Sequence, residues 1–363
     1  MTDYSKPTEC KTYAAMGASQ PFQPHTIIRR ACGPKDIVID VLYAGICHSD
    51  IHTARDEWGP ALYPLVPGHE IGGRIVAVGS EVKNFQIGQH AGVGCMVDSC
   101  RSCKMCKIGD EQYCLQAPVF TYNSKFKFQH CAEYNEQGGN PAYGGYSKSI
   151  VVDEAFALNI PMSLDLAGAT PLMCAGITVY SPMKRFGLTP GMKFGVIGLG
   201  GLGHMAVKFG LAFGCNTTVI SRGTTKKESS LNDLKAHAFI DSKNEDEMKA
   251  AAGTFDFIVC TVSAKYDLAP YLNLLTYDGK FIVVGAPADP LDLRAGALIF
   301  KRITMAGSLI GGIKETQEML DFCGEHNIVC DIEKISAQEI DGAYDRTVSG
   351  DVKYRFVIDT ATI

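Results

Sequence analysis

The sequence predicts an α/β protein in which an irregular β domain precedes a doubly wound, six-stranded parallel sheet. Short strands broken by proline and glycine fill residues 1–160, a pattern typical of irregular β structure. From about residue 165, six short apolar segments alternate with helical stretches, which favours a parallel sheet with helices on both faces. A chain of 363 residues is also long enough to form two separate cores.

In the first domain, two segments are predicted as strands. Residues 37–43 alternate and are rich in branched side chains, as half-buried strands are. Residues 71–78 form another strand, in which Gly72 and Gly73 indicate a bulge or a close backbone approach. The polar and aromatic stretch 123–145 is too long for a tight turn, so we expect an unusual loop there.

The second domain is predicted from its alternation of strands and helices. We expect strands at residues 192–197, 217–221, 238–241, 255–262, 280–284 and 303–309, and a helix from 204 to 213. A further helix is expected over residues 313–326, followed by Asn327 as its stop. The final segment VKYRFVID (352–359) is strand-like again, and we expect it to return to the first domain.

Composition and charge exclude several function classes. The net charge of −5 leaves no basic excess for nucleic acid. No run of about 18 apolar residues occurs, so no membrane-spanning segment is predicted. The polar N-terminus MTDYSKPTEC lacks the pattern of a secretory signal. We therefore expect a cytoplasmic protein with neither nucleic-acid nor membrane partners.

A cluster of four cysteines predicts a structural metal site. Cys100, Cys103, Cys106 and Cys114 lie within 15 residues, and four thiolates suit tetrahedral zinc with no open position. An iron–sulfur cluster is the alternative, but the spacing differs from ferredoxin patterns; free thiols are a second alternative. Three cations between the cysteines are expected to offset the thiolate charge: Arg101, Lys104 and Lys107.

A second set of metal-ligand types lies upstream. Cys47 opens the run Cys-His-Ser-Asp, His52 follows it, and His69 stands beside Glu70 further along the chain. Each motif alone is weak evidence for a metal site, because a single cysteine is usually buried as a small apolar residue. Together they supply a thiolate, an imidazole and carboxylates, the groups that a catalytic zinc uses. Their spacing does not show whether they meet or which residue completes the set.

A glycine-rich turn predicts dinucleotide binding. The six residues of the turn satisfy G-x-G-x-x-G between a predicted strand and a predicted helix: Gly198, Leu199, Gly200, Gly201, Leu202 and Gly203. Glycines there let the backbone approach a pyrophosphate at the helix N-terminus. A turn that serves packing alone is the alternative.

The residues about 20 positions later favour NADP over NAD. An acid at that point would bind the ribose 2′-hydroxyl and repel a 2′-phosphate. This chain instead has Ser221, Arg222 and Lys226, with no acid before Glu228. Lys226 could alternatively be part of a solvated helix start, but cations are unfavourable at a helix N-terminus. An anionic partner explains these cations better.

With these motifs in order, the chain resembles zinc-containing medium-chain alcohol dehydrogenases. It is most similar to the cinnamyl alcohol dehydrogenase group and its bacterial NADP-dependent aldehyde-reductase relatives. The resemblance rests on segments spread over nearly the whole chain: GICHSDIH (45–52), VPGHEIGG (66–73), VGCMVDSCRSCKMC (93–106), PLMCAGITVYSPMKRFGL (171–188), GVIGLGGLGH (195–204), GSLIGG (307–312), ETQEML (315–320) and VKYRFVID (352–359).

The resemblance implies two domains and two zinc ions per chain. A GroES-like catalytic domain would comprise residues 1–173 and 313–363, with the structural-zinc lobe at about 95–116, and a Rossmann domain residues 174–312. Cys174 would be the third protein ligand of the catalytic zinc, beside Cys47 and His69.

Further roles are implied around this zinc. Glu70 would lie next to the metal, and Asp50 would orient His69. Ser49 and His52 match the proton relay of the family, in which many relatives have Thr at the position of Ser49.

The resemblance also implies nucleotide and substrate contacts. Beyond the glycine turn and the cations, the expected nucleotide contacts are His48, Thr178, Val284, Ser308 and Arg355. The expected apolar substrate pocket comprises Trp58, Cys95, Phe120, Ile299 and Leu309. Phe120 stands where plant members tend to have Trp, so their substrate preference does not carry over.

The implied function is the interconversion of aldehydes and primary alcohols, aromatic, allylic or broad, with NADP(H), in a homodimer. One alternative is an NADPH-dependent reductase of conjugated imines or double bonds, although the Ser49/His52 relay argues against it. Another is a non-catalytic NADPH-binding relative, which predicts a broken zinc-ligand set. A zinc adaptor built on the four cysteines would leave the glycine turn unexplained.

Overall fold

The computed structural model describes residues 2–128, 130, 141–287 and 289–363. The chain divides into two compact units, one of residues 1–177 with 311–363 and one of residues 178–310. The first boundary falls inside helix α5 (Ala175–Arg185), a few residues after the predicted boundary. Cys174 therefore belongs to the first unit, whereas the predicted boundary assigned it to the nucleotide-binding domain.

The first unit is built on a mixed sheet. Among the described residues, its strands run in the order β16-β17-β3-β4-β5-β9, with β8 also paired to β3. The strands of the unit are β1 (Thr8–Ala14), β2 (Gln23–Arg29), β3 (Asp36–Gly45), β4 (Ile71–Val78), β5 (His90–Val93), β6 (Met96–Asp98), β7 (Val119–Phe120), β8 (Ser149–Asp153), β9 (Leu158–Asn159), β16 (Ile332–Ile335) and β17 (Arg355–Asp359). Its helices are α1 (His48–Ala54), α2 (Lys104–Lys107), α4 (Leu166–Ala169), α10 (Ile313–His326) and α11 (Ile340–Ser349).

The two glycines of β4 allow its close packing on β3. Gly73 pairs with Val41 and Gly72 with Tyr43, so the intervening residue of β3 forms a bulge. A Cβ on Gly73 would lie 2.1 Å from the Asp40 carbonyl oxygen. The predicted bulge and close approach are thus both present.

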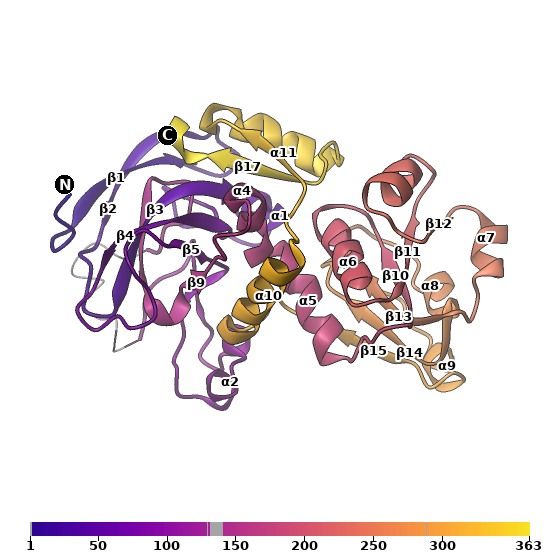
Figure 1. Cartoon of the computed structure of the whole chain (residues 1–363). Coiled ribbons are helices and arrows are strands. Elements are labelled where there is room, and N and C mark those ends of the chain that lie inside the picture. The colour runs from indigo at the N-terminus through magenta and orange to yellow at the C-terminus, as the bar shows by residue number, and fades with distance from the viewer. Residues whose placement is uncertain (1, 129, 131–140, 288) are drawn as a thin grey trace. The chain divides into compact units, whose positions relative to one another are not determined.

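The C-terminal strand completes this sheet. β17 pairs antiparallel with β3, and Ile358 faces Ala44 in the register; Figure 1 shows the yellow β17 beside the indigo β3. This confirms the predicted return of the tail. The helix α10 has the bounds predicted for it, and Asn327 ends it with a left-handed φ of 51°, a conformation that asparagine tolerates.

The second unit is a doubly wound parallel sheet, as predicted. Its strands are ordered β12-β11-β10-β13-β14-β15, so the chain starts in the middle of the sheet and reverses once. The strands are β10 (Lys193–Ile197), β11 (Asn216–Ser221), β12 (Ala238–Asp241), β13 (Phe255–Cys260), β14 (Leu275–Val283) and β15 (Thr304–Gly307). The helices are α6 (Gly201–Ala212), α7 (Glu245–Ala250), α8 (Ala269–Asn273) and α9 (Ala295–Ile299).

The strand β14 begins five residues before its predicted start. Leu275 pairs with Phe255, and after a register shift Lys280 pairs with Phe257. The intervening Tyr277 and Asp278 are exposed, so this part of the strand has no apolar run by which the sequence would reveal it.

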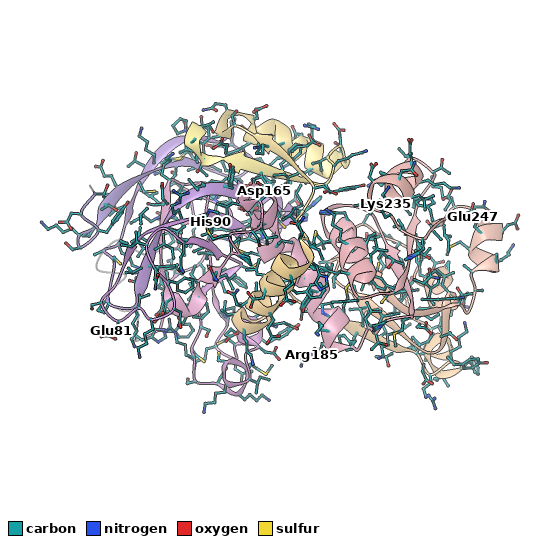
Figure 2. The ribbon with its side chains drawn as sticks, viewed as in Figure 1. Glu81, His90, Asp165, Arg185, Lys235 and Glu247 are labelled. Carbon is teal, nitrogen blue, oxygen red and sulfur yellow. The ribbon has the colours of Figure 1, made fainter. Side chains whose placement is uncertain are left out.

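Most of the predicted 123–145 loop lies outside the part of the chain that can be described. Ser124 forms a bridge to Ala142, while residues 129 and 131–140 are not described. Charged side chains cover the outside of each unit, as Glu81 and Lys235 illustrate in Figure 2. No helix in the described ranges is long and apolar enough to cross a membrane.

Candidate active site

Four buried side chains of the first unit converge on one point. Cys47 caps the N-terminus of α1 after β3, His69 and Glu70 directly precede β4, and Cys174 ends a short 3-10 helix. The Cys47 and Cys174 sulfurs lie 3.9 Å apart, and His69 Nε2 lies 3.3 Å from the Cys174 sulfur. With Glu70, all four ligand atoms lie within 4.8 Å of one another.

These separations fit a tetrahedral zinc ion. Zinc bonds of about 2.3 Å to sulfur and about 2.0 Å to nitrogen place two sulfurs roughly 3.8 Å apart and sulfur and nitrogen roughly 3.5 Å apart. The observed distances are close to both values. Glu70 Oε2 is also buried and has no hydrogen-bond partner among the described residues. A buried carboxylate oxygen without a donor is costly, so its position beside the thiols and imidazole also favours a cation.

Asp50 fixes the orientation of this donor set. Its Oδ1 lies 3.1 Å from His69 Nδ1 and accepts from the Gly68 amide, while Oδ2 accepts from the Cys47 amide at 2.9 Å. Asp50 is fully buried, and one carboxylate thus aligns two of the side chains. His69 therefore presents Nε2 to the sulfurs, which is the usual arrangement of a metal-binding histidine.

Glu70 pairs with Arg355 from the C-terminal strand. Arg355 Nη2 donates a hydrogen bond to Glu70 Oε1, and both side chains are buried. Burial raises the pKa of Glu70 to about 8, against the opposing charge of Arg355. Arg355 was expected at the nucleotide. Within the first unit it pairs with a carboxylate of the candidate metal site, because β17 pairs with β3 and brings the two side chains together.

Helix α1 carries the predicted relay residues. Cys47 Sγ donates to Ser49 Oγ at 3.7 Å, and Thr53 Oγ1 donates to the Ser49 carbonyl oxygen. His52 is partly exposed, and its ring stacks on Trp58 with centroids 4.7 Å apart. Its Nδ1 hydrogen-bonds Glu57 Oε2.

Glu57 is a site residue that sequence analysis missed. The Glu57 amide also donates to the His52 carbonyl oxygen at 2.9 Å, so the turn after α1 returns the carboxylate to the ring. The signal in the sequence was an acid five positions after a candidate relay histidine, a separation that lies outside the i+3 and i+4 helical pairs.

The four-cysteine cluster also forms a compact donor set. All four sulfurs lie within 4.8 Å of one another, with Cys106 3.8 Å from Cys100 and 3.5 Å from Cys103. The Cys103 amide donates to the Cys100 sulfur and the Leu115 amide to the Cys103 sulfur. Such contacts stabilise thiolates. The arrangement fits a closed tetrahedral zinc site with no position left for a substrate.

The basic side chain of Arg101 does not serve this cluster as expected. Its guanidinium pairs with Asp98 and Asp153. These carboxylates lie at the end of β6 and at the end of β8, so Arg101 fastens the lobe to the sheet.

Replacing Cys103 with alanine is expected to lower thermal stability rather than to stop catalysis directly. A three-thiolate site binds zinc more weakly, and the metal holds a loop-rich lobe. We expect the melting temperature to fall by about 5–10 °C, measured by calorimetry. The half-buried Cys32 is outside both clusters, so Cys32→Ala is the matched control. If Cys103→Ala and Cys32→Ala had the same melting temperature, a structural role for the metal would be contradicted.

The glycine turn of the second unit forms an open cradle. Gly198 has a φ of +88°, and a Cβ on Gly203 would lie 2.0 Å from the Gly198 carbonyl oxygen. Gly200 caps the 12-residue helix α6 without a side-chain hydrogen bond, and nothing lies within 4 Å of a Cβ built on it. The first amides of α6 are thus available to an anion, as a pyrophosphate site requires.

Two cations flank this cradle. Lys226 Nζ donates to the Leu199 carbonyl oxygen at 2.6 Å, which holds the side chain over the turn. Arg222 follows the end of β11, is exposed, and has no ion pair with any residue that the structure describes. Burial lowers the pKa of Lys226, and so does the neighbouring Arg222. Two nearby cations with no acid between them in the sequence fit a bound phosphate.

Comparison with known proteins identifies the family. Residues 33–162 match the alcohol dehydrogenase GroES-like domain, and residues 201–325 match the zinc-binding dehydrogenase model. An NADP-dependent alcohol dehydrogenase C 1 of Mycolicibacterium smegmatis is 49% identical over 97% of this chain and 98% of its own length. The chain belongs to the zinc-binding alcohol dehydrogenase family.

Solved structures agree with this family assignment. A cinnamyl alcohol dehydrogenase of Sorghum bicolor is 45% identical and has a TM-score of 0.91 over 98% of both chains. The CAD of Helicobacter pylori, solved in complex with NADP(H), is 43% identical and has a TM-score of 0.88 over 98% of this chain and 99% of that one. The fold class is thereby confirmed: a GroES-like domain combined with a Rossmann domain.

The residues predicted as further nucleotide contacts each have a defined place within their own unit. In the second unit, Val284 and Ser308 follow the carboxyl ends of β14 and β15, the edge where such sheets bind ligands. Thr178 is buried in α5. In the first unit, His48 opens α1, and burial lowers the pKa of its imidazole.

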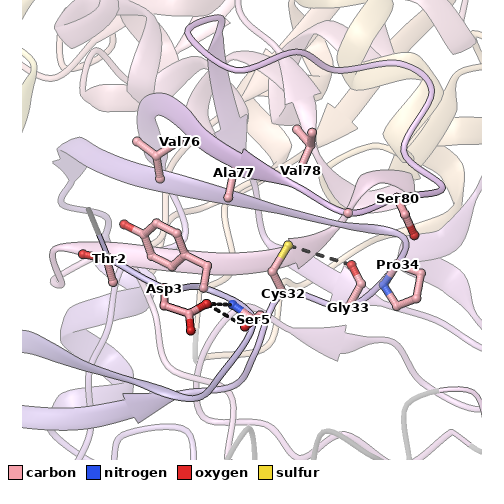
Figure 3. Close-up of a pocket in the computed structure, with 12 residues that line it drawn as sticks. Thr2, Asp3, Ser5, Cys32, Gly33, Pro34, Val76, Ala77, Val78 and Ser80 are labelled. Carbon is pink, nitrogen blue, oxygen red and sulfur yellow. Dashed lines mark hydrogen bonds between the residues drawn. The ribbon is translucent and has the colours of Figure 1, made fainter.

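The expected substrate-pocket residues are mostly exposed within their own units. Trp58 and Phe120 are exposed in the first unit, as Ile299 and Leu309 are in the second, whereas Cys95 is half-buried. A groove of about 690 Å³ in the first unit lies elsewhere, between the N-terminal segment and residues 76–80 (Figure 3). None of the predicted site residues lines that groove.

Proposed function

We propose that this chain interconverts primary alcohols and aldehydes with NADP(H) on a catalytic zinc held by Cys47, His69 and Cys174. The observation that carries this proposal is the convergence of two thiols and one imidazole at tetrahedral separations. Three protein ligands with a carboxylate nearby is the composition of a catalytic zinc site. The similarity to NADP-dependent and cinnamyl alcohol dehydrogenases supports the same chemistry.

The residues of this chain have separable roles in that reaction. When bound, zinc supplies Lewis-acid polarisation of the carbonyl and the reduced nicotinamide supplies the hydride. The thiolates of Cys47 and Cys174 would hold the metal together with His69 and would offset its charge. Asp50 keeps His69 in the tautomer that presents Nε2.

Proton transfer is assigned to helix α1. Ser49 Oγ gives its proton to the oxygen that becomes the alcohol hydroxyl, and His52 is the exposed end through which the proton is replaced. Glu57 holds His52 Nδ1 and so leaves Nε2 as the exchanging atom. Glu57 is therefore a positioning residue for the relay.

Glu57→Gln is expected to lower kcat about tenfold, because part of the general acid–base contribution is lost when the imidazole is poorly oriented. The KM for NADPH should change little. A solvent deuterium isotope effect on kcat should increase, which a purely structural role would not cause. Glu57→Asp, which keeps the charge, should restore part of the rate; full activity of Glu57→Gln with an unchanged isotope effect would exclude the role.

The preference for NADP(H) is proposed from the cations beside the glycine turn. Arg222 and Lys226 supply charge-assisted donors for a 2′-phosphate, and Ser221 at the end of β11 offers a hydroxyl. The remaining nucleotide contacts are proposed from the family resemblance: His48, Thr178, Val284, Ser308 and Arg355.

We also propose a homodimer in the cytoplasm. β15 is the last strand in its sheet and pairs with β14 within the described residues, so its other edge is available for a second copy. Ile299 and Phe300, at the end of α9 and a few residues before β15, are 72% and 83% exposed. Sedimentation equilibrium tests this proposal, and we expect the mass of two chains.

The cytoplasm is proposed because zinc binding requires reduced thiols, which favour a reducing compartment.

The proposed function is tested by steady-state assays with a panel of aldehydes, using NADPH and NADH, on protein whose zinc content has been counted. We expect two zinc ions per chain and turnover of apolar aldehydes with NADPH. Reduction of conjugated imines or double bonds without aldehyde turnover would overturn the proposal, and so would cofactor binding without any turnover.

A further inference from the structure

The ring of Tyr122 lies against the imidazole of His69. The two ring centroids are 5.7 Å apart, and the ring planes are inclined by 28°, which is an offset stack. His69 and Tyr122 are only 5% and 8% exposed, so this contact is shielded from water. Aromatic pairs of this kind contribute about 0.5–1.5 kcal/mol beyond the area that they bury.

Hydrogen bonds on both sides hold the Tyr122 segment in place. Before the tyrosine, the Thr121 amide donates to the Cys95 carbonyl oxygen at 3.1 Å. After it, Asn123 Oδ1 accepts from the Leu62 amide at 2.7 Å. The tyrosine ring also belongs to a buried apolar cluster that includes residues of helix α1. A ring whose neighbours are fixed in this way is a rigid surface for the side chain that it contacts.

Asp50 and Tyr122 restrain different motions of the imidazole. Asp50 Oδ1 lies 3.1 Å from His69 Nδ1 and so decides which ring nitrogen faces the sulfurs. This single hydrogen bond still allows the imidazole to tilt about the line that joins Nδ1 to the carboxylate oxygen. A ring packed against one face of the imidazole opposes that tilt, because tilting would either bring atoms too close or open a gap. The atom that tilting would move is Nε2, which lies 3.3 Å from the Cys174 sulfur.

We propose that Tyr122 is a positioning residue for the catalytic zinc, and that its ring keeps Nε2 of His69 directed at the metal. This inference rests on the proposed function, because it assumes zinc on Cys47, His69 and Cys174. The ring acts by packing and not by proton transfer. Burial raises the pKa of the Tyr122 hydroxyl, so the side chain stays neutral. Loss of a group that orients a metal ligand typically lowers metal affinity about 10- to 100-fold.

Two substitutions separate the ring of Tyr122 from its hydroxyl. Tyr122→Phe keeps the ring, so the catalytic zinc should pass to a chelating dye within about twofold of the original rate, whereas Tyr122→Leu should release it at least about tenfold faster. The release phase that is missing from Cys174→Ala identifies the catalytic zinc. Release from the four-cysteine site should not change. If Tyr122→Leu does not fold, Tyr122→Met, whose flexible side chain fills irregular gaps, takes its place.

Cobalt spectroscopy tests the same role without measuring release. When Co²⁺ replaces the catalytic zinc, its visible absorption bands report the geometry of the ligands. Tyr122→Leu should change these bands and Tyr122→Phe should not. Phe22→Leu is the matched control, because Phe22 belongs to the same buried cluster but its ring packs on Tyr146 and Tyr344. This control should lower the melting temperature about as much as Tyr122→Leu and leave the cobalt bands unchanged.

The outcomes distinguish this inference from the function beneath it. If Tyr122→Leu leaves zinc release and the cobalt bands unchanged, the positioning role is excluded while the proposed function stands. The role is also excluded if Phe22→Leu has the same effects as Tyr122→Leu, or if Tyr122→Phe does. If the unaltered protein shows no release phase that depends on Cys174, the ligand set of the proposed function fails, and both proposals fail with it.

Discussion

Replacing Cys174 with alanine is expected to remove the catalytic metal and nearly all turnover while the fold persists. The sulfur of Cys174 lies 3.9 Å from that of Cys47 and 3.3 Å from His69 Nε2, so its loss leaves two strong ligands. Metal-assisted polarisation contributes several kcal/mol to such reactions. We therefore expect kcat/KM for an aldehyde to fall by at least about 1000-fold.

Metal analysis and melting curves test the reason for that loss. Zinc per chain should fall from two to one in Cys174→Ala. The melting temperature should remain close to that of the unaltered protein, because the four-cysteine site is intact. Cys215→Ala is the matched control, since Cys215 is also buried but its thiol donates to the Thr189 carbonyl oxygen and belongs to neither metal-ligand set among the described residues; this variant should keep both zinc ions. Substantial turnover with one zinc per chain would refute the assignment of Cys174.

Reversing the charges beside the glycine turn is expected to change the cofactor preference. In the double variant Arg222→Asp with Lys226→Glu, two cations become two anions around the proposed 2′-phosphate position. Each charge-assisted hydrogen bond that is lost costs about 1.5–3 kcal/mol, and about 1.4 kcal/mol corresponds to a tenfold change. We expect the KM for NADPH to rise about 100-fold or more.

The comparison with NADH makes this prediction specific. NADH has no 2′-phosphate, so its KM should change by less than about threefold. Lys227→Glu alters the charge of the neighbouring exposed lysine and is the matched control for a general electrostatic effect. Equal increases for NADPH and NADH in the double variant would show that these side chains do not select the cofactor.

Elements with a strong local pattern could be predicted from the sequence. The strand β4 (Ile71–Val78) and the helix α10 (Ile313–His326) have the predicted bounds. The strand β12 (Ala238–Asp241) does as well. In α10 apolar residues recur at the helical period, and Gly79 after β4 and Asn327 after α10 mark the ends of these two elements. The polar beginning of β14 was missed because sheet pairing, and not its own side chains, places it in the sheet.

Charged side chains were harder to assign than elements. Arg101 was expected at the thiolates and pairs with Asp98 and Asp153 instead. Arg355 pairs with Glu70, a contact that the sequence did not predict; its expected contact with the nucleotide stays a prediction. A long side chain can reach several partners, and only the packing around it decides which one it contacts.

The sequence by itself determined the sites whose donors are near neighbours: four cysteines within 15 residues and a glycine turn between a strand and a helix. Local chain geometry is enough to bring such groups together. Only the tertiary structure decided the second metal set, in which Cys47 and Cys174 are separated by 127 positions and Glu70 and Arg355 by 285. The register of β3 with β4 and β17 brings Cys47, Glu70 and Arg355 together, and the 3-10 helix packed on these strands adds Cys174. Register depends on the packing of a whole sheet.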